Sequence, residues 1–232
     1  MHPRHRLLLL ETSTAVLTVA LAEDGKVVAS RICREPRMQA SLTAPLVKEV
    51  LDEMQLGVKD CDAVCVSKGP GSYTGLRVGV STAKGLAFGA GIPLLSVGTL
   101  DILALGAALK GSDEPLRAIV PMIDARRMEV YTAVFSPAGE RLGEVAPMVV
   151  DAHSFEDLLA QGPVLFTGDG ALKCREVLTS PNARFLEAAP DARAMAQLAE
   201  AAFQESRFED VAYFEPFYLK EFIATVSRKN LF

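Results

Sequence analysis

A glycine-rich segment is the first place in this chain where residue types and spacing suggest chemistry. Residues 68–85 read KGPGSYTGLRVGVSTAKG, with five glycines and several hydroxyl side chains directly after an apolar run. Glycines let backbone N–H groups approach a phosphate closely, and the N-terminus of a following helix attracts anions. The segment therefore raises the hypothesis of a phosphate-binding loop.

The segment departs from both common nucleotide-binding patterns. In the P-loop pattern G-x-x-x-x-G-K-[ST], Gly75 fits the second glycine but Leu76 stands where the lysine belongs. In the dinucleotide pattern G-x-G-x-x-G, Gly69 and Gly71 fit but Thr74 replaces the third glycine. Generic anion binding at the helix N-terminus stays open for the first part of the segment.

The second part of the segment predicts a helix with small residues at helical spacing. One ridge recurs every four residues, at Gly75, Gly79, Ala83 and Ala87, and the adjacent ridge holds Ser81, Gly85 and Gly89. A glycine inside a helix costs about 1 kcal/mol relative to alanine, so close approach of another backbone should offset the cost. Two interpretations stay open, namely packing on the protein's own sheet or packing against a partner's helix.

The histidines offer no metal site. His2 and His5 lie three residues apart at an end that we expect to fray, and His153 stands alone before a helix cap, where we expect a surface position. The sequence contains neither HExxH nor GxSxG, so zinc-peptidase and serine-hydrolase chemistry of those types lacks its residues. We predict no bound metal.

The cysteines and the composition indicate a reduced, cytosolic protein. Cys33, Cys61, Cys65 and Cys174 form no CxxC pair, and the parity of Cys61 and Cys65 predicts that both point to one side of one strand. The leucine run of MHPRHRLLLLE ends after four residues, too short for a signal peptide, and no run reaches the roughly 20 apolar residues of a membrane span. The net charge of −5 gives no global basic footprint for nucleic acid.

The elements that position these residues alternate between strands and helices. In the first half we expect strands at 7–11, 15–22, 27–33, 61–67 and 92–97, and helices at 39–56, from the glycine-rich loop to about 89, and at 99–109. Asp24-Gly25 predicts a hairpin turn. Pro45 predicts a late start or a bend in the helix at 39–56, and Gly57 should cap its C-terminus.

The second half repeats this order less regularly. We expect strands at 118–123, 128–135, 140–150 and 164–167, a helix at 154–160 capped by Ser154 with Asp157 in a variant capping box, and a helix at 191–205. The whole pattern is typical of an α/β, two-lobed actin-like ATPase (ribonuclease H-like) fold with mixed sheets flanked by helices. The expected lobes are residues 1–100 and 101–232, the last elements being able to pack back on the first lobe.

Five segments together resemble one family. ETSTAVLTVAL, VSKGPGSYTGLRVGVSTAKGLAFGAGIPLLSVGTL, PMIDARRMEVYTAVF, GDGALK and FEPFYLKEF occur in this order along nearly the whole chain. They resemble the TsaB (formerly YeaZ) family, the dimerisation subunits of the bacterial tRNA threonylcarbamoyladenosine machinery. Glu11, where the family usually has aspartate, and Gln39, where many relatives have histidine, depart from the pattern.

The resemblance implies a scaffold subunit without catalytic residues of its own. It implies pairing with the catalytic paralogue TsaD through first-lobe helices in a four-helix bundle, recruitment of the ATPase TsaE, homodimers when the chain is alone, and only indirect contact with tRNA. ATP and magnesium would be used by the complex and no cofactor would be held by this chain alone. The expected interface residues are Leu42, Leu46, Val50, Gly75, Arg77, Val78, Gly79, Thr82, Ala83 and Leu86.

A vestigial nucleotide or anion site is a further hypothesis, set against the simpler interpretation of a structural turn. Similarity to working actin-like ATPases implies Glu11, Thr12, Ser13 and Asp169, and anion binding at the helix N-terminus adds Ser72 and Thr74. We interpret Asp124 as closing its own turn, with Arg126 and Arg127 exposed, and the aromatic cluster Phe214, Phe217, Tyr218 and Phe222 as core or subunit contact. The competing hypotheses are an ATPase or small-molecule kinase of the same fold, or the peptidase activity implied by the family's older glycoprotease label.

Overall fold

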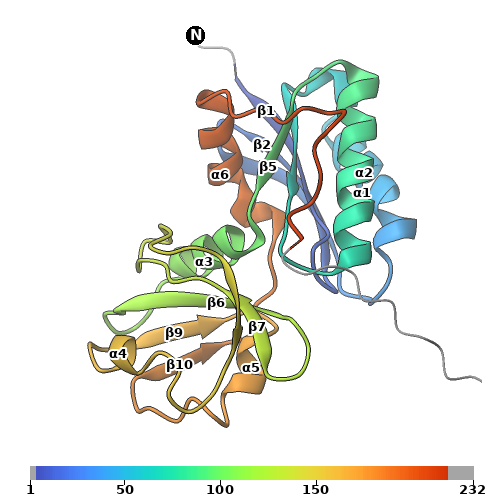
Figure 1. Cartoon of the computed structure of the whole chain (residues 1–232). Coiled ribbons are helices and arrows are strands. Elements are labelled where there is room, and N and C mark those ends of the chain that lie inside the picture. Colours follow the sequence, from blue (N-terminus) through green and yellow to red (C-terminus); the bar gives the residue numbers. More distant parts are fainter. Residues whose placement is uncertain (1–3, 219–232) are drawn as a thin grey trace, which may run out of the picture.

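Two mixed sheets, one in each lobe, organise the chain (Figure 1). The computed structural model describes residues 4–218. Helices flank both sheets, so the predicted arrangement of mixed sheets flanked by helices is confirmed. No helix within residues 4–218 combines the length and apolar character needed to cross a membrane.

The leucine run forms the central strand of the first sheet. β1 (Arg6–Glu11) pairs antiparallel with β2 (Leu17–Glu23), which pairs antiparallel with β3 (Lys26–Cys33). On its other edge β1 pairs parallel with β4 (Ala63–Ser67), and β4 pairs parallel with β5 (Leu94–Val97). The strand order is therefore β3-β2-β1-β4-β5.

The predicted Asp24-Gly25 hairpin turn joins β2 to β3. Both residues have positive φ, 49° at Asp24 and 73° at Gly25, as the favoured two-residue hairpin turn requires. The Asp24 carboxylate also accepts a hydrogen bond from the His5 N–H at 2.9 Å, which ties the start of the chain to this turn.

Helices cover both faces of the first sheet. α1 (Gln39–Glu53) and α2 (Tyr73–Ala90) lie side by side on one face, and α6 (Ala192–Gln204) covers the other (Figure 1). Because side chains alternate along a strand, Leu8 packs with α1 and α2 whereas Leu9 packs with α6. The last helix therefore completes the core of the first lobe.

The second sheet repeats the plan of the first. β6 (Ala118–Asp124) pairs antiparallel with β7 (Glu129–Thr132), which pairs antiparallel with β8 (Ala146–Val149). β6 also pairs parallel with β9 (Val164–Thr167), and β9 with β10 (Ala183–Leu186). The order β10-β9-β6-β7-β8 makes β6 the counterpart of β1.

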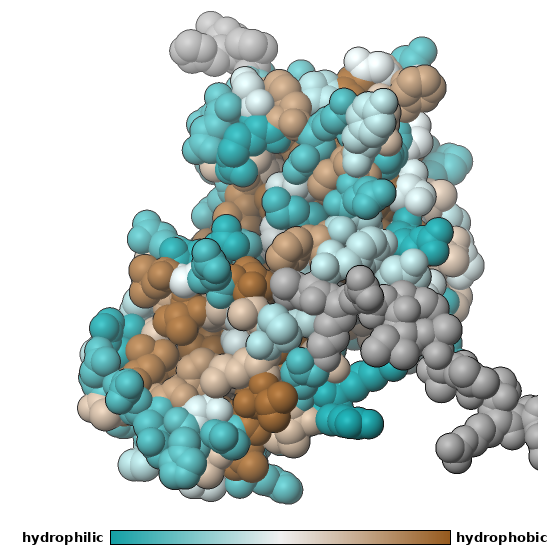
Figure 2. Space-filling view, in the orientation of Figure 1, coloured by the Kyte–Doolittle hydropathy of each residue, from teal (hydrophilic) through white to brown (hydrophobic). Residues whose placement is uncertain are grey.

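Shorter elements complete the second lobe. α3 (Thr99–Lys110) packs against β6 and also against α6, so it joins the two lobes (Figure 1). α4 (Glu156–Leu159) and α5 (Ala171–Cys174) are single turns. In the view of Figure 2, apolar side chains gather on the second lobe. The exposed large apolar residues of this lobe include Leu109, Leu142, Val149 and Leu172.

α1 differs from the prediction at its C-terminal end and in one of the two effects expected of Pro45. The helix begins at Gln39 and contains Pro45, so the late start is excluded, whereas a bend at Pro45 stays a prediction. It ends at Glu53, and Gly57 instead precedes the 3-10 turn η1 (Val58–Asp60). The chain already leaves the helix at Gln55, whose φ is 56°, so the reversal is made before the glycine is reached.

Further corrections concern the second lobe and one cysteine. Ser154 does not cap α4, because Phe155 precedes the helix and the Ser154 hydroxyl donates to the Asp151 carboxylate at 2.9 Å. The predicted strand at 140–150 is limited to β8, and β10 and α5 were not predicted. Cys61 lies before β4 and packs with the α1–α2 face, whereas Cys65 faces α6, so the two thiols do not share a side.

Candidate functional site

Glu11 ends β1 and is turned into the protein. Its side chain is fully buried, and Oε1 accepts a hydrogen bond from the Ser13 N–H at 2.6 Å. Oε2 has no hydrogen-bond partner among the described residues. Burial raises the pKa of Glu11 to about 7, against the opposing effect of the Ser13 hydrogen bonds. The carboxylate therefore organises its own turn.

Thr12 and Ser13 form the surface on which α2 rests. The Thr12 hydroxyl donates a 2.8 Å hydrogen bond to the Gly75 carbonyl oxygen. A Cβ atom on Gly71 would lie 2.3 Å from the Ser13 carbonyl oxygen, one on Gly75 2.2 Å from the Thr12 carbonyl oxygen, and one on Gly79 2.1 Å from Thr12 Oγ1. Three glycines of the segment therefore let α2 approach the loop after β1.

This contact decides between the two interpretations of the first small-residue ridge. The ridge faces the protein's own loop and sheet, so it does not form an exposed partner surface. Five of the expected interface residues are buried within the chain and cannot contact a partner in this fold. They are Leu46, Val50, Gly75, Gly79 and Ala83. Those that reach the surface fully or partly are Leu42, Arg77, Val78, Thr82 and Leu86.

The second ridge faces outward. Ser81, Gly85 and Gly89 are exposed, and a Cβ atom on either glycine would meet nothing within 4 Å. Phe88 beside them is 82% exposed. An exposed phenylalanine next to small residues gives another helix both apolar area and room for close approach. Sequence reasoning noted the ridge but did not select Ser81, Gly85 or Phe88 as interface residues.

The loop before α2 opens onto a cleft of about 610 Å³ between the lobes, which we call the hydroxyl cleft. Ser72 caps α2 by accepting from the Gly75 N–H at 3.3 Å. Ser13, Ser72, Thr74 and Asp169 all line this cleft, so the structure brings together four of the six residues of the expected nucleotide or anion site. Glu11 and Thr12 are buried beneath it.

The second lobe contributes acidic groups that are already engaged. Asp169 Oδ1 accepts the Asp124 N–H at 2.9 Å, and burial raises the pKa of Asp169. Asp124 accepts the Arg126 N–H at 2.8 Å and forms an ion pair with Lys173. The interpretation of Asp124 as closing its own turn is confirmed, and Arg126 and Arg127 are exposed as expected. Arg126 lines the hydroxyl cleft and supplies its positive charge.

Within residues 4–218, no group of three or more His, Cys, Asp or Glu side chains could hold a metal ion. His153 lies at the surface as expected and pairs with Glu156 at 2.7 Å. His5 is not frayed, because its Nδ1 lies 3.1 Å from Glu200 Oε1 on α6 and its ring contacts Phe203. His2 falls outside the described residues.

The four cysteines are free, as expected. Burial raises the pKa of Cys61 to about 11 and also raises the pKa values of Cys65 and Cys174. Only Cys33 is partly exposed. Since the thiolate is the reactive form, the three buried thiols serve packing rather than chemistry.

A C-terminal strap, residues 207–218, runs back over the first lobe. Lys84 Nζ on α2 donates to the carbonyl oxygens of Ala212 and Phe214, both at 3.1 Å. The Phe217 N–H donates to the Lys68 carbonyl oxygen at 2.7 Å. The strap is therefore hydrogen-bonded both to α2 and to the glycine-rich loop.

The aromatic residues of the strap are placed by these contacts. Phe214 packs against the first-lobe core, in agreement with the prediction of a core contact. The Tyr218 ring lies 5.1 Å from the Tyr73 ring at the start of α2. Phe217 lines the hydroxyl cleft, and Phe222 falls outside the described residues.

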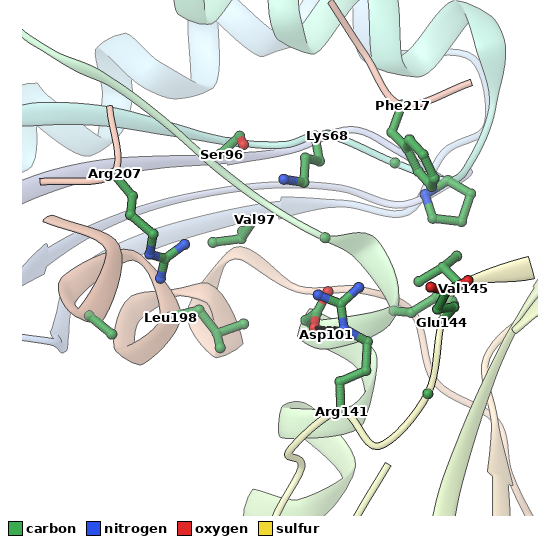
Figure 3. Close-up of a pocket in the computed structure, with 16 residues that line it drawn as sticks. Lys68, Ser96, Val97, Asp101, Arg141, Glu144, Val145, Leu198, Arg207 and Phe217 are labelled. Atoms are coloured by element: carbon green, nitrogen blue, oxygen red, sulfur yellow. Dashed lines mark ion pairs between the residues drawn. The ribbon is translucent and has the colours of Figure 1, made fainter. Parts of the chain in front are cut away.

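A second cavity of about 780 Å³ also lies between the lobes, and sequence reasoning missed it (Figure 3). We call it the basic cavity, because Lys68, Arg141 and Arg207 line it. Pro70 and Phe217 line both spaces. Its residues come from the loop after β4, from β5, α3 and α6, from the strap and from the loop before β8, which are too far apart in the sequence to form a local motif.

Comparisons with known proteins give a consistent result. A family model described as TsaD, tRNA N6-adenosine threonylcarbamoyltransferase, matches residues 37–227. The tRNA threonylcarbamoyladenosine biosynthesis protein TsaB of Escherichia coli K12 is 31% identical over 237 residues, 94% of this chain and 96% of that protein. TsaB of Bacillus subtilis 168 is 35% identical over 166 residues, 70% of each chain. The solved structure of YeaZ from Pseudomonas aeruginosa matches with a TM-score of 0.80 at 28% identity, covering 93% of this chain and 100% of that one. The two-lobed actin-like fold is thereby confirmed.

Proposed function

The chain belongs to the TsaB (YeaZ) family, and from that premise we propose that it acts as a scaffold subunit in the biosynthesis of threonylcarbamoyladenosine in tRNA. In this proposal it pairs with the catalytic paralogue TsaD, and the pair recruits the ATPase TsaE. ATP and magnesium are used by the complex, tRNA is reached through the partners, and the assembly works in the cytosol.

The outward face of α2 carries the proposal. Phe88 is 82% exposed, and the neighbouring Gly85 and Gly89 have open space around their Cα atoms. Since α1 lies alongside α2, a partner that presents a similar helix pair would form a four-helix bundle (Figure 1). In the absence of TsaD, a second copy of this chain presents the same face and forms a homodimer.

The geometry near β1 supports a scaffold role rather than catalysis. Glu11, the acidic residue after the first strand, is buried and bound to the Ser13 N–H. The Asp169 carboxylate in the hydroxyl cleft accepts a hydrogen bond from the Asp124 N–H. Both side chains are therefore engaged by backbone N–H groups of this chain.

Replacement of Phe88 tests the pairing. Phe88→Ser should lower the fraction of chain that co-purifies with its cognate TsaD, measured by size-exclusion chromatography with light scattering, and should lower tRNA modification by the reconstituted complex. Tyr213→Ser is the matched control, because Tyr213 is 84% exposed but lies on the strap. Pairing unchanged by Phe88→Ser, or equal loss in both variants, would contradict the proposed interface.

The hydroxyl cleft favours one second candidate, a nucleotide-hydrolysing or kinase activity of the actin-like fold. Ser13, Ser72, Thr74 and Asp169 converge there in a space of about 610 Å³. Titration of the isolated chain with ATP and magnesium distinguishes the candidates. Saturable ATP binding with turnover in the absence of partners would overturn the scaffold proposal.

A further inference from the structure

The basic cavity collects positive charge from three separate elements. Lys68 follows β4, Arg207 begins the strap after α6, and Arg141 belongs to the loop that precedes β8. Figure 3 shows these side chains entering the same space from different sides, with Val97 and Leu198 between them. Cations from distant parts of the chain thus meet at one place between the lobes.

Only one of these cations is neutralised by a carboxylate inside the cavity. Arg141 pairs with Asp101 at 3.6 Å, the interaction drawn in Figure 3. Within residues 4–218, the Lys68 ammonium has no ion-pair partner. Arg207 pairs with Glu205, which does not line the cavity and is exposed, so this pair is weak.

The charges of Lys68 and Arg207 act on the same region. Both oppose the effect of burial on the pKa of Cys65 in β4, whereas Glu11 and Glu209 act in the opposite direction. The Glu209 carboxylate accepts a hydrogen bond from the Ser96 hydroxyl at the cavity wall. Lys68 and Arg141 together oppose the effect of burial on the pKa of Asp101 at the start of α3. The geometric observation beside these shifts is that Lys68, Arg141 and Arg207 line the same cavity. Glu144 is the other carboxylate that lines the cavity, and it is exposed, as are Arg141 and Arg207.

The remaining lining sets the size and character of an occupant. Val97, Leu198, Val145 and Phe217 supply apolar surface, and the volume of about 780 Å³ lies in the range of small-molecule sites. Two cations without a carboxylate partner in the cavity match a dianionic group. A phosphate monoester supplies a charge of about −1.5 to −2 at neutral pH together with three acceptor oxygens, which suit both an ammonium and a guanidinium.

We propose that the basic cavity binds a small phosphate monoester, with its phosphate between Lys68 and Arg207 and its apolar body against Val97, Leu198 and Phe217. The site is distinct from the hydroxyl cleft, where the serine and threonine side chains gather. It does not depend on the pairing of this chain with another protein. Because its walls come from both lobes and from the strap, an occupant also fixes the position of one lobe relative to the other.

The test uses phenyl phosphate as the probe, titrated into the full-length chain by calorimetry at low ionic strength. Benzoate carries the same ring with a carboxylate, and inorganic phosphate and sulfate carry no apolar body. The variants are Lys68→Gln and Arg207→Gln. Arg126→Gln is the matched control, because Arg126 supplies the positive charge of the hydroxyl cleft. Circular dichroism and a thermal melt without probe establish that each variant is folded.

The expected result is saturable binding of phenyl phosphate that weakens about tenfold or more in each of Lys68→Gln and Arg207→Gln and is unchanged in Arg126→Gln. Inorganic phosphate should bind more weakly than phenyl phosphate, and benzoate more weakly still. No binding at millimolar probe, or loss of binding in Arg126→Gln instead, would overturn the proposal. Equal binding of benzoate or sulfate would overturn the assignment to a phosphate monoester.

Discussion

The carbonyl oxygen of Thr12 lies 2.2 Å from the position that a Cβ atom on Gly75 would occupy, and the Thr12 hydroxyl donates a 2.8 Å hydrogen bond to the Gly75 carbonyl oxygen. The loop after β1 and the first turn of α2 are thus held together by a close backbone approach and by one hydrogen bond from a side chain to the backbone. Only glycine at position 75 leaves room for this contact. The contact therefore explains Gly75, which the sequence alone suggested was part of a phosphate-binding loop.

Gly75→Ala should therefore destabilise the chain. The added methyl group meets a carbonyl oxygen of the backbone, which cannot rotate away, so the loop or the helix must shift. We expect a loss of about 2 kcal/mol in the free energy of unfolding, within the range of overpacked sites. Urea denaturation followed by circular dichroism measures it. Stability equal to that of the parent chain would contradict the contact.

Gly85→Ala, ten residues further along the same helix, should have the opposite effect. Nothing lies within 4 Å of the added Cβ atom, so the change removes only the conformational cost of glycine. The free energy of unfolding should rise by about 1 kcal/mol. The measurement should be made at protein concentrations where light scattering finds a monomer, because Gly85 belongs to the proposed pairing surface. A loss of stability in the monomer would show that this face is not open.

Glu11 predicts a pH dependence of stability. Its pKa is raised from 4.5 to about 7 in the folded state, so folding favours the protonated form. The stabilisation is complete below pH 4.5 and is lost as the pH rises toward 7, an effect on the order of 3 kcal/mol for a shift of this size. Glu11→Gln cannot ionise, so its stability relative to the parent chain should increase between pH 4.5 and pH 7.5. Urea midpoints that change in parallel for the two proteins over this range would exclude the effect.

The thiols should differ sharply in reactivity. Cys33 is partly exposed, whereas Cys61, Cys65 and Cys174 are buried and have raised pKa values. Under native conditions at pH 8, a disulfide reagent such as Ellman's should modify one thiol rapidly and the others only on unfolding. Cys33→Ser should remove the fast phase. A fast phase that survives this change would place a reactive thiol elsewhere.

The elements predicted best from the sequence are those whose pattern is local. β1, the Asp24-Gly25 turn, α2 and α6 follow from apolar runs, turn residues and helical periodicity. The ends of helices are predicted less accurately where two residues close together could each end or cap the helix. Gly57 looked like a helix cap, but Gln55 turns the chain first, and Ser154 looked like a cap, but it bonds to Asp151.

The sites were harder to predict because they depend on contacts between distant residues. The spacing of Gly75 and Gly79 predicts close packing but does not identify the segment that approaches them. That segment contains Thr12, which lies more than sixty residues away in the chain. The basic cavity could not be read from a motif, because Lys68, Arg141 and Arg207 meet only after both lobes and the strap have folded. The sequence groups Ser13, Ser72 and Asp169 in one candidate site, and the fold places all three on the lining of the hydroxyl cleft.

The return of α6 to the first lobe has a consequence for how the chain acquires its structure during synthesis. Leu7, Leu9, Ala20 and Leu95 form one face of a sheet whose cover, α6, is synthesised only after all strands of the second lobe. Until that helix emerges, the nascent first lobe exposes an apolar face and cannot complete its core. Folding of the two lobes is therefore coupled from the outset, and a fragment that ends before α6 should depend on chaperones or aggregate.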